Sequence, residues 1–421
     1  MGGLGKRLEI ETKGLPKPMV DVCGKPFFRY QLELLKWNGF KRFVFCTGHR
    51  AEAIEEYFGN GGRFGVSIEY SDDGDRLLGT AGALKKAQSF FEKDLMAIYG
   101  DSFMDIDYEE LLCHYASKKH DKNCRIMMAV LKNRNQYERS NVIFKNGRVV
   151  VYDKKRPSSK MDYVDYGVSV MDRGVLSDIP AGEAVDLSDV YHDLARRHLL
   201  LGHEVYNRFY EIGTPHSLDE FRGFVEERFL KEKPAVFLDR DGTINESVRN
   251  AESEAWDSPF DENQLKLLPK VPEALRLLQS MGYRLIVATN QPAAAKGKAS
   301  LAALYRVNHR LNLTLKESGV ELDALFACYH HPVGAANVKD SFLIHECDCR
   351  KPKPGLLKKA TEKLNIDLGA SYMVGDSEKD VLAGKAMGLK TVFVGNPTQT
   401  TDADHRFKDL YDFALFLKRE Q

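Results

Sequence analysis

The segment AVFLDRDGTIN, residues 235–245, decides the fold of the second half of the chain. Its first four residues are apolar and bounded by polar ones, which is the pattern of a short buried strand. Asp239 and Asp241 follow where this strand ends, and Gly242 allows the backbone to turn sharply away. Because open α/β sheets bind ligands at the carboxyl ends of their strands, the segment predicts an acidic site there.

Outward from this segment, apolar runs alternate with helical patterns over almost the whole chain. Such alternation is typical of a βα chain and predicts an α/β protein with largely parallel sheets flanked by helices. In the second half the expected helices are 271–281, 301–318, 354–364 and 378–387, and the expected strands are 283–289, 324–329, 372–374 and 391–394.

The first half shows the same alternation up to about residue 100. The expected helices are 26–38, 52–58 and 80–90, and the expected strands are 42–47, 66–70 and 95–100. Between residues 125 and 170 the pattern changes to strands only, so a small antiparallel extension is expected beside the main sheet.

Length and charge indicate two domains of balanced charge. The chain has 421 residues, with 61 Lys and Arg against 61 Asp and Glu, and neither half is strongly basic or acidic. A nucleic-acid partner is therefore not expected. No long apolar run or secretory leader is found, so we expect no membrane span and a cytoplasmic location. A charged stretch at 231–234 predicts the linker between a domain at 1–230 and a domain at 235–421.

Three further strand ends in the second half present polar groups suited to phosphate chemistry. Thr289 and Asn290 end one expected strand, and Asp376 follows another. Arg350 and Lys351 stand at a further junction between elements. An aspartate can accept a phosphoryl group if Mg²⁺ neutralises charge and a second carboxylic acid protonates the leaving alkoxide.

We therefore predict Asp239 as the nucleophile and Asp241 as the general acid and base. Thr289, Asn290 and Lys351 are expected to hold the phosphoryl oxygens. The expected Mg²⁺ ligands are oxygen atoms of Asp239, Asp241 (through its backbone carbonyl) and Asp376.

Three of the seven cysteines cluster with a histidine. The pairs C-x-H and C-x-C stand 16 residues apart, a spacing that predicts a closed tetrahedral Zn²⁺ site of structural type. The expected ligands are Cys328, His330, Cys347 and Cys349, with His331 and His345 as alternatives to His330. Such a zinc ion would hold the loop that brings Arg350 and Lys351 into the acidic site.

The second half resembles the haloacid dehalogenase-type phosphatases. Within them, the strings CDCRKPKPG (347–355) and SYMVGD (371–376) resemble the D-glycero-D-manno-heptose 1,7-bisphosphate 7-phosphatases and the histidinol-phosphate phosphatases, over most of residues 235–400. The resemblance implies that Arg350 recognises the substrate and that Lys351 steadies the transferring phosphoryl group. The segment QPAAAKG (291–297) and a longer loop at 246–259 depart from the family pattern.

The first half resembles the sugar-1-phosphate nucleotidyltransferases, most closely the heptose-1-phosphate guanylyltransferase branch. Four ordered motifs support this: GGLGKRL (2–8), PKPMVDVCGKP (16–26), GTAGAL (79–84) and YGD (99–101). The resemblance implies that backbone groups of the glycine loop cradle the nucleotide phosphates, with cations at the pyrophosphate and the attacked phosphorus. The residues implied in nucleotide or substrate binding are Gly2, Gly3, Gly5, Arg7, Lys17, Gly79, Gly82, Lys154, Lys155, Asp165 and Gly167, and those implied in Mg²⁺ binding are Asp101 and Glu211.

Two departures bear on activity in the first half. Members of this family carry an apolar strand immediately before the glycine loop, and none precedes it in this sequence. Glu211 also stands where the family usually has an aspartate. Either the strand is encoded upstream or this half is a non-catalytic binding module.

The two resemblances together imply a bifunctional enzyme of nucleotide-sugar synthesis. The second half would remove one phosphate of a sugar bisphosphate, and the first would join the remaining sugar 1-phosphate to an NTP, with GTP and heptose favoured. One alternative is a phosphatase fused to a non-catalytic domain. Another is a phosphatase acting on histidinol phosphate or another small phosphomonoester. The sequence leaves the oligomeric state open.

Overall fold

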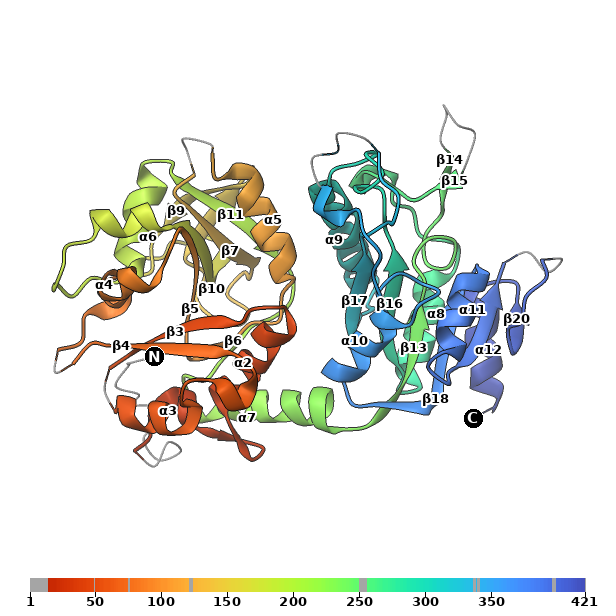
Figure 1. Cartoon of the computed structure of the whole chain (residues 1–421), viewed down its shortest axis with the longest axis horizontal. Helices are drawn as coiled ribbons and strands as arrows, with labels where there is room; N and C mark the ends of the chain where they lie inside the picture. The colour runs from red at the N-terminus through yellow and green to blue at the C-terminus, as the bar shows by residue number, and fades with distance from the viewer. Residues whose placement is uncertain are drawn as a thin grey trace. The chain divides into compact units, whose positions relative to one another are not determined.

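The computed structural model divides the chain into two compact units, residues Met1–Glu226 and Glu227–Gln421 (Figure 1). It describes residues 14–48, 50–74, 76–120, 124–249, 256–335, 338, 341–395 and 399–420. The α/β class expected from the sequence is confirmed in both units.

The second unit is built on a six-stranded sheet whose strand pairs are all parallel. The strand order is β17-β16-β13-β18-β19-β20, so β13, which leads into the AVFLDRDGTIN turn, lies in the middle. The strands are β13 (Lys233–Leu238), β16 (Arg284–Asn290), β17 (Ala324–Cys328), β18 (Ile366–Gly375), β19 (Lys390–Val394) and β20 (His405–Phe407).

Helices cover this sheet, and their apolar stripes explain the packing. The helices are α8 (Val271–Ser280), α9 (Leu301–Glu317), α10 (Gly355–Lys363), α11 (Glu378–Lys385) and α12 (Leu410–Glu420). One core cluster joins α8, α12 and the end of α9 to the central strands, with Leu238, Leu278 and Phe413 fully buried. β13 and β16 are buried on both faces, so they read in the sequence as continuous apolar runs.

The main strands of the first unit, among its described residues, form two separate sheets. β3 (Arg42–Thr47) and β4 (Ser67–Asp72) form a parallel pair by themselves. A six-stranded sheet has the order β5-β10-β7-β11-β9-β8. Its strands are β5 (Asp94–Ile98), β7 (Ile126–Lys132), β8 (Val142–Lys145), β9 (Arg148–Tyr152), β10 (Tyr163–Asp172) and β11 (Leu200–Val205).

The strands between residues 125 and 170 are not an extension beside a parallel sheet. β10 lies inside the six-stranded sheet and runs antiparallel to both β5 and β7, while β7 and β11 are parallel. The sheet of the second unit is thus parallel, and the larger sheet of the first unit is mixed. Local apolar patterns identify the strands but not their neighbours, because pairing order depends on contacts distant in sequence.

Helices of the first unit surround these strands. They are α2 (Phe27–Trp37), α3 (Ala51–Phe58), α4 (Gly79–Lys86), α5 (Tyr108–Lys118), α6 (Leu187–Arg196) and α7 (Pro215–Val225). α2 and α3 pack on β3 and β4 around Phe28, Phe45 and Phe58, while α4 and α6 pack on the larger sheet. Short strand pairs complete the two units: β1 (Asp21–Val22) with β2 (Lys25–Pro26), β6 (Ser102–Phe103) with β12 (Tyr210–Glu211), and β14 (Val248–Arg249) with β15 (Trp256–Asp257).

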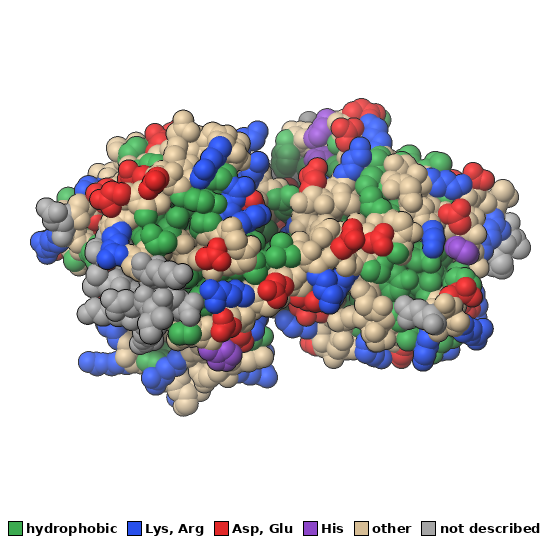
Figure 2. Space-filling view, turned by 90° about the horizontal axis from the view of Figure 1, so that it is seen from below, with side chains coloured by type: hydrophobic (Ala, Val, Ile, Leu, Met, Phe, Trp, Pro, Cys, Tyr) green, Lys and Arg blue, Asp and Glu red, His purple; other side chains and the backbone are tan. Residues whose placement is uncertain are grey.

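The surface mixes charges of both signs. On the face drawn in Figure 2, Lys and Arg side chains are interspersed with Asp and Glu over both units. Among the helices of the described residues, none has the length and apolar character needed to cross a membrane.

Candidate active sites

The acidic site of the second unit lies where β13 and β18 end side by side. Leu238 pairs with Val374, and the backbone N–H of Asp239 donates to the Val374 carbonyl over 2.9 Å. Asp239 and Asp376 therefore follow two adjacent parallel strands at the same edge of the sheet. The pairing of these strands, more than any local motif, brings the two carboxylates together.

Lys351 is buried between two carboxylates. Its Nζ lies 2.8 Å from Asp239 Oδ1 and 2.5 Å from Asp380 Oδ1, and only 2% of its side chain is exposed. Asn290 holds the backbone of Lys351 from both sides, since its Nδ2 donates to the carbonyl and its Oδ1 accepts from the N–H, each over 3.0 Å. The expected phosphoryl-binding residues Asn290 and Lys351 thus form one hydrogen-bonded unit.

Burial and charge shift the ionisation of this cluster. Burial raises the pKa of Asp239 to about 6, although Lys351 opposes the shift. Burial and the nearby Asp239 carboxylate raise the pKa of Asp376 to about 7. Burial alone would lower the pKa of Lys351, but the Asp239 and Asp380 carboxylates raise it above its ordinary value. The site therefore holds more negative groups than a single lysine neutralises.

Asp241 is held by a different set of donors. Arg240, which is fully buried, donates to its carboxylate from Nε and Nη2 over 3.0–3.1 Å. Asn245 Nδ2 donates over 2.9 Å and Gln291 Nε2 over 2.6 Å. Gln291 Nε2 also donates to Thr289 Oγ1 over 3.0 Å, so the expected phosphoryl-binding hydroxyl lies in the same network.

These donors set the charge of Asp241. Burial would raise its pKa, but Arg240 and the Asn245 and Gln291 amides lower the pKa overall. Asp241 is thus an ionised, oriented carboxylate. Arg240, Asn245 and Gln291 were not among the expected site residues.

The donor atoms fit a divalent cation. Carboxylate oxygens of Asp239, Asp376 and Asp380 lie within 4.8 Å of one another. A Cβ at Gly242, whose φ is +81°, would lie 2.0 Å from Asp376 Oδ2, so only glycine lets the turn pass this carboxylate. Lys351 contacts both Asp239 and Asp380, so Asp376 is the one of these three carboxylates that does not pair with Lys351. Carboxylate oxygens are the ligands that a hard cation such as Mg²⁺ prefers.

Asp380 is a site residue that the sequence analysis missed. It lies in the first turn of α11, where Ser377 donates to its Oδ2 from both N–H and hydroxyl over 3.1 and 2.6 Å. In the sequence, Asp380 stands three residues after Ser377, at the start of a helix. This spacing is that of an ordinary helix cap, so it gave no sign of a role in the site.

The cysteine and histidine cluster forms at the end of β17. Sulfur–sulfur distances among Cys328, Cys347 and Cys349 are 3.1–3.6 Å, and His330 Nδ1 lies 3.2 Å from Cys349 Sγ and 3.9 Å from Cys328 Sγ. A tetrahedral zinc ion with Zn–S bonds of about 2.3 Å separates its sulfur ligands by about 3.8 Å. The four groups are therefore close to the spacing of a Cys₃His zinc site.

The two alternative histidines have other partners. His331 Nδ1 lies against the carbonyl and N–H of Val333, and His345 Nδ1 against the Phe342 carbonyl. Of the three candidates, only His330 is grouped with the cysteines.

Arg350 follows the zinc loop directly and has an unused donor. Its Nη1 is buried without a hydrogen-bond partner among the described residues. Burial lowers the pKa of Lys296, and the nearby cations Arg350, Lys298 and Lys379 lower it further. A group of cations with an unsatisfied donor is suited to an anionic part of a substrate.

In the first unit, Lys17, Asp101 and Glu211 lie together just beyond the end of β5. Lys17 Nζ lies 3.3 Å from Asp101 Oδ2. Glu211 pairs with Ser102 through β12 and β6, which places it beside Asp101. A hydrogen bond with Glu138, then burial, raises the pKa of Glu211 to about 8. Glu138 is a further acidic neighbour that the sequence analysis did not name.

Lys154 and Lys155 point to different surroundings. Lys154 Nζ lies 5.9 Å from the Tyr99 ring centroid, beside the strand end that carries Asp101. Lys155 forms an exposed ion pair with Asp189 over 2.5 Å. Of these two lysines, Lys154 is the one that lies near the strand end carrying Asp101.

Asp165 and Gly167 lie in the same region. Asp165 accepts from the Gly167 N–H over 2.9 Å and from the Tyr152 hydroxyl over 3.1 Å, and burial raises its pKa. Gly167 has a φ of +92°, and a Cβ there would lie 3.1 Å from the Tyr99 ring.

The two glycines of GTAGAL have a packing role. A Cβ at Gly79 would lie 2.6 Å from the Val185 carbonyl oxygen, and one at Gly82 would lie 2.6 Å from that of Glu183. Their small size lets α4 pack against residues 183–185, and an approach to a nucleotide stays a prediction. Gly2, Gly3, Gly5 and Arg7 of the expected phosphate loop lie outside the described residues.

Comparison with known proteins identifies both halves. A family model described as nucleotidyl transferase matches residues 1–227, and one described as haloacid dehalogenase-like hydrolase matches residues 182–388. The D-glycero-β-D-manno-heptose-1,7-bisphosphate 7-phosphatase of Salmonella typhi is 37% identical over 197 residues, covering 45% of this chain and 98% of the relative. That of Vibrio cholerae is 40% identical over 160 residues, covering 38% and 79%.

Solved structures are similar to each half separately. A D,D-heptose 1,7-bisphosphate phosphatase from B. bronchiseptica, complexed with magnesium and phosphate, has a TM-score of 0.37 and 27% identity, over 45% of this chain and 99% of that one. HddC from Yersinia pseudotuberculosis has a TM-score of 0.45 and 20% identity, over 53% and 96%.

Both families are enzyme families. The first match ends at the boundary between the two units, and the second match begins at residue 182 within the first unit and covers most of the second. The chain therefore belongs to the nucleotidyl transferase family in its first part and, in its second, to the haloacid dehalogenase-like hydrolases related to the heptose-bisphosphate 7-phosphatases.

Proposed function

We propose that the second domain, residues 235–421, is a Mg²⁺-dependent phosphatase that removes the 7-phosphate of D-glycero-D-manno-heptose 1,7-bisphosphate. The first domain, residues 1–230, then joins the heptose 1-phosphate product to GTP, releasing pyrophosphate and forming GDP-heptose. The observation that supports this most is the buried Asp239–Lys351 pair, 2.8 Å apart, with Asp241 beside it.

In the first step, an oxygen of Asp239 attacks the phosphorus, and the bond from phosphorus to the sugar oxygen breaks. Asp241, protonated, gives its proton to that oxygen. Lys351, Thr289 and Asn290 hold the phosphoryl oxygens. Oxygen atoms of Asp239, Asp376 and the Asp241 carbonyl would hold Mg²⁺, which would offset the charge of the phosphoryl group.

In the second step, water attacks the phosphorus of the aspartyl phosphate, and Asp241 takes the water proton as inorganic phosphate leaves. Arg240, Asn245 and Gln291 lower the pKa of Asp241, which supports the ionised form that this step needs. In the first step Asp241 has to be protonated. It therefore has to move away from these donors, because the loss of their hydrogen bonds raises its pKa.

The cationic group around Arg350 supports a substrate with a second phosphate. Arg350 Nη1 lacks a partner among the described residues, and Lys296 and Lys379 lie near it. A sugar bisphosphate would place its remaining phosphate there. The relatives of Salmonella typhi and Vibrio cholerae bear the name of such a phosphatase, which favours this substrate over histidinol phosphate.

Phosphate release from the α and β anomers of heptose 1,7-bisphosphate tests the first reaction, with Asp239→Asn as the inactive control. Adding GTP and Mg²⁺ and detecting GDP-heptose tests the second. Phosphate without GDP-heptose would favour a phosphatase joined to a non-catalytic domain. A higher kcat/KM for histidinol phosphate than for the bisphosphate would contradict the proposed substrate.

A further inference from the structure

Helix α9 carries an asparagine, Asn308, in its buried stripe. The other buried residues of this helix, such as Leu304, Val307 and Leu311, are apolar or aromatic, and only 6% of Asn308 is exposed. An amide enclosed in an apolar core costs free energy unless its donor and its acceptor are both used. Asn308 therefore needs specific partners, and the structure shows one at each end of its amide.

The two partners of Asn308 are Arg240 and Tyr329. Asn308 Oδ1 accepts from Arg240 Nη1 over 2.6 Å, and Asn308 Nδ2 donates to the Tyr329 hydroxyl over 2.9 Å. Both partners are buried too. Tyr305 of α9 and Tyr329 have ring centroids 5.0 Å apart, so the helix lies against the end of β17 (Figure 1). The three side chains thus form one buried, hydrogen-bonded chain.

One end of this chain holds the Asp241 carboxylate. Arg240 donates to Asp241 from Nε and Nη2 over 3.0–3.1 Å, and to Asn308 from Nη1. Because a guanidinium is planar and its N–H donors point in fixed directions, contacts at two of its edges fix its orientation. A guanidinium held by Asp241 alone could turn, or could follow the carboxylate when it moves toward the leaving oxygen.

The other end of the chain is fixed by the place of Tyr329 in the sequence. Tyr329 stands between Cys328 and His330, two members of the cysteine and histidine cluster. Cys328 is fully buried and ends β17, where it pairs with Asn290 of β16. The sheet therefore holds the backbone before Tyr329, and the cluster holds the backbone after it.

We propose that Asn308 is a positioning residue for Asp241. It joins Arg240, which holds the Asp241 carboxylate, to Tyr329, which the sheet and the cluster hold in place. This connection runs from the cluster to Asp241 without passing through the loop that leads to Lys351. The inference rests on the proposed phosphatase reaction, in which Asp241 protonates the leaving oxygen, and it does not depend on which sugar the protein uses.

The leaving group of the substrate separates positioning of Asp241 from general support of the fold. The ratio kcat/KM covers the steps up to the aspartyl phosphate, and in these steps Asp241 acts on the leaving oxygen. A sugar alkoxide needs the proton of Asp241, whereas nitrophenolate, a much weaker base, leaves without it. Loss of positioning should therefore lower kcat/KM for a sugar phosphate and spare p-nitrophenyl phosphate. Damage to the Asp239–Lys351 pair would lower both.

The variant Asn308→Leu, made in the full chain and assayed with Mg²⁺, tests this inference. We expect kcat/KM for heptose 1,7-bisphosphate to fall by about tenfold or more, and that for p-nitrophenyl phosphate to change by less than about twofold. Tyr329→Phe removes only a hydroxyl group and should give the same pattern to a smaller extent, which keeps the test open if Asn308→Leu does not fold. Asn312→Leu, the same substitution at an exposed position one turn later in α9, is the matched control and should change neither value.

The zinc content of the same variants provides a readout besides activity. We expect Asn308→Leu to hold as much zinc as the wild type, and a loss of zinc would overturn the inference because the cluster would then be the cause. An equal fall in kcat/KM for both substrates, or no fall for the sugar phosphate, would overturn it as well.

Failure of the proposed function gives a different result. If the wild type hydrolyses other sugar phosphates but not heptose 1,7-bisphosphate, the proposed substrate is wrong, and the comparison with p-nitrophenyl phosphate is made on those sugar phosphates. A wild type without phosphatase activity on any of them would overturn both the proposed function and this inference.

Discussion

Each unit places a lysine beside an aspartate at the carboxyl end of a strand, but the two pairs differ in burial. In the second unit Lys351 and Asp239 are 2.8 Å apart and their side chains are 2% and 14% exposed. In the first unit Lys17 and Asp101 are 3.3 Å apart and 20% and 35% exposed. The same pair of residue types is thus part of a buried network in one unit and partly exposed in the other.

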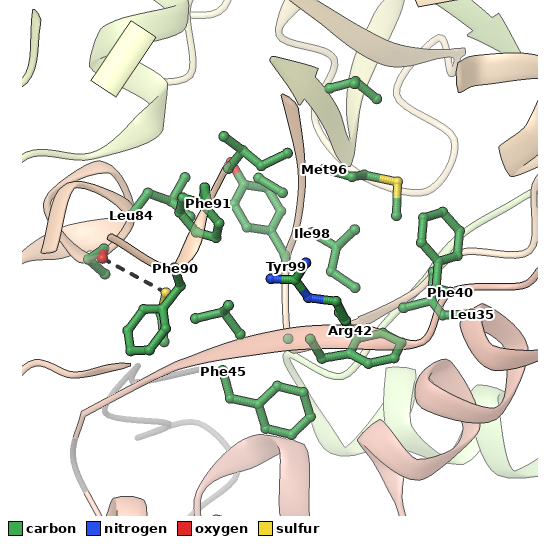
Figure 3. Close-up of a pocket in the computed structure, with 18 of the residues that line it drawn as sticks. Leu35, Phe40, Arg42, Phe45, Leu84, Phe90, Phe91, Met96, Ile98 and Tyr99 are labelled. Atoms are coloured by element: carbon green, nitrogen blue, oxygen red, sulfur yellow. Dashed lines mark hydrogen bonds between the residues drawn. The ribbon is translucent and has the colours of Figure 1, made fainter. Parts of the chain in front are cut away.

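The difference follows from the sheets. β13 has a partner on each side, β16 and β18, so the turns that carry the carboxylates are fixed from both directions. β5 has a partner on one side only within the described residues, and a cavity lined by residues 42–46 and 94–100 borders the other (Figure 3). A site at strand ends is preorganised to the extent that the strands beneath it are paired.

The largest expected effect is the loss of phosphatase activity in Asp239→Asn. Removing a covalent nucleophile should lower phosphate release by about 10⁴-fold or more. Nucleotide binding and GDP-heptose formation from added heptose 1-phosphate should stay unchanged. Retained phosphate release would show that the paired sheet does not hold the reactive carboxylate.

Zinc removal should disable the second unit selectively. Chelation, or Cys347→Ser, frees the loop that leads to Arg350 and Lys351, and we expect phosphatase activity to fall by about 100-fold or more. Metal analysis should find about one zinc ion per chain. Cys23→Ser in the first unit is the matched control and should keep both metal and activity. A chain that is active without zinc would contradict this role of the cluster.

Removing the partly exposed Lys17 should have a smaller effect than removing the buried Lys351. Lys17→Met should reduce nucleotidyl transfer by about 10²-fold, because one cation at the reacting phosphate is lost. Lys351→Met should also destabilise the second unit, since Asp239 and Asp380 would lose their buried partner. Thermal unfolding separates the two cases. An equal fall in Tm in the two variants would contradict the expectation that the buried lysine matters more for stability than the partly exposed one.

The smallest expected effect is a pH dependence of stability in the metal-free second unit. The pKa values of Asp239, about 6, and Asp376, about 7, lie above the ordinary value of about 3.9. The folded state therefore binds protons more tightly than the unfolded chain, and its stability is lost as pH rises through these values. We expect Tm to rise by a few degrees as pH falls from about 7 to about 5.

Adding Mg²⁺ should cancel or reverse this trend, because the ion favours the ionised carboxylates. Asp376→Asn is the control and should flatten the curve. A metal-free Tm that falls over the same range would contradict the raised pKa values.

The sequence was sufficient to name residues that the structure places close together at one edge of the second unit's sheet. Asp239, Asp241, Asn290 and Lys351 were named because each stands at a strand end or junction, and such positions meet at one edge of a parallel sheet. The zinc cluster was predicted from spacing alone, since two closely spaced pairs of soft ligands are typical of a zinc site. In both cases the chemistry follows from residue type and local position.

Only the tertiary structure decided which groups act together. Asp380 reaches Lys351 and Gln291 reaches Asp241 because α11 packs on β18, and β18 and β16 flank β13 in the sheet. The sequence could not indicate that the strands of residues 126–172 enter a mixed sheet. Local patterns depend on a residue and its near neighbours, whereas strand order and cavities depend on contacts between distant segments.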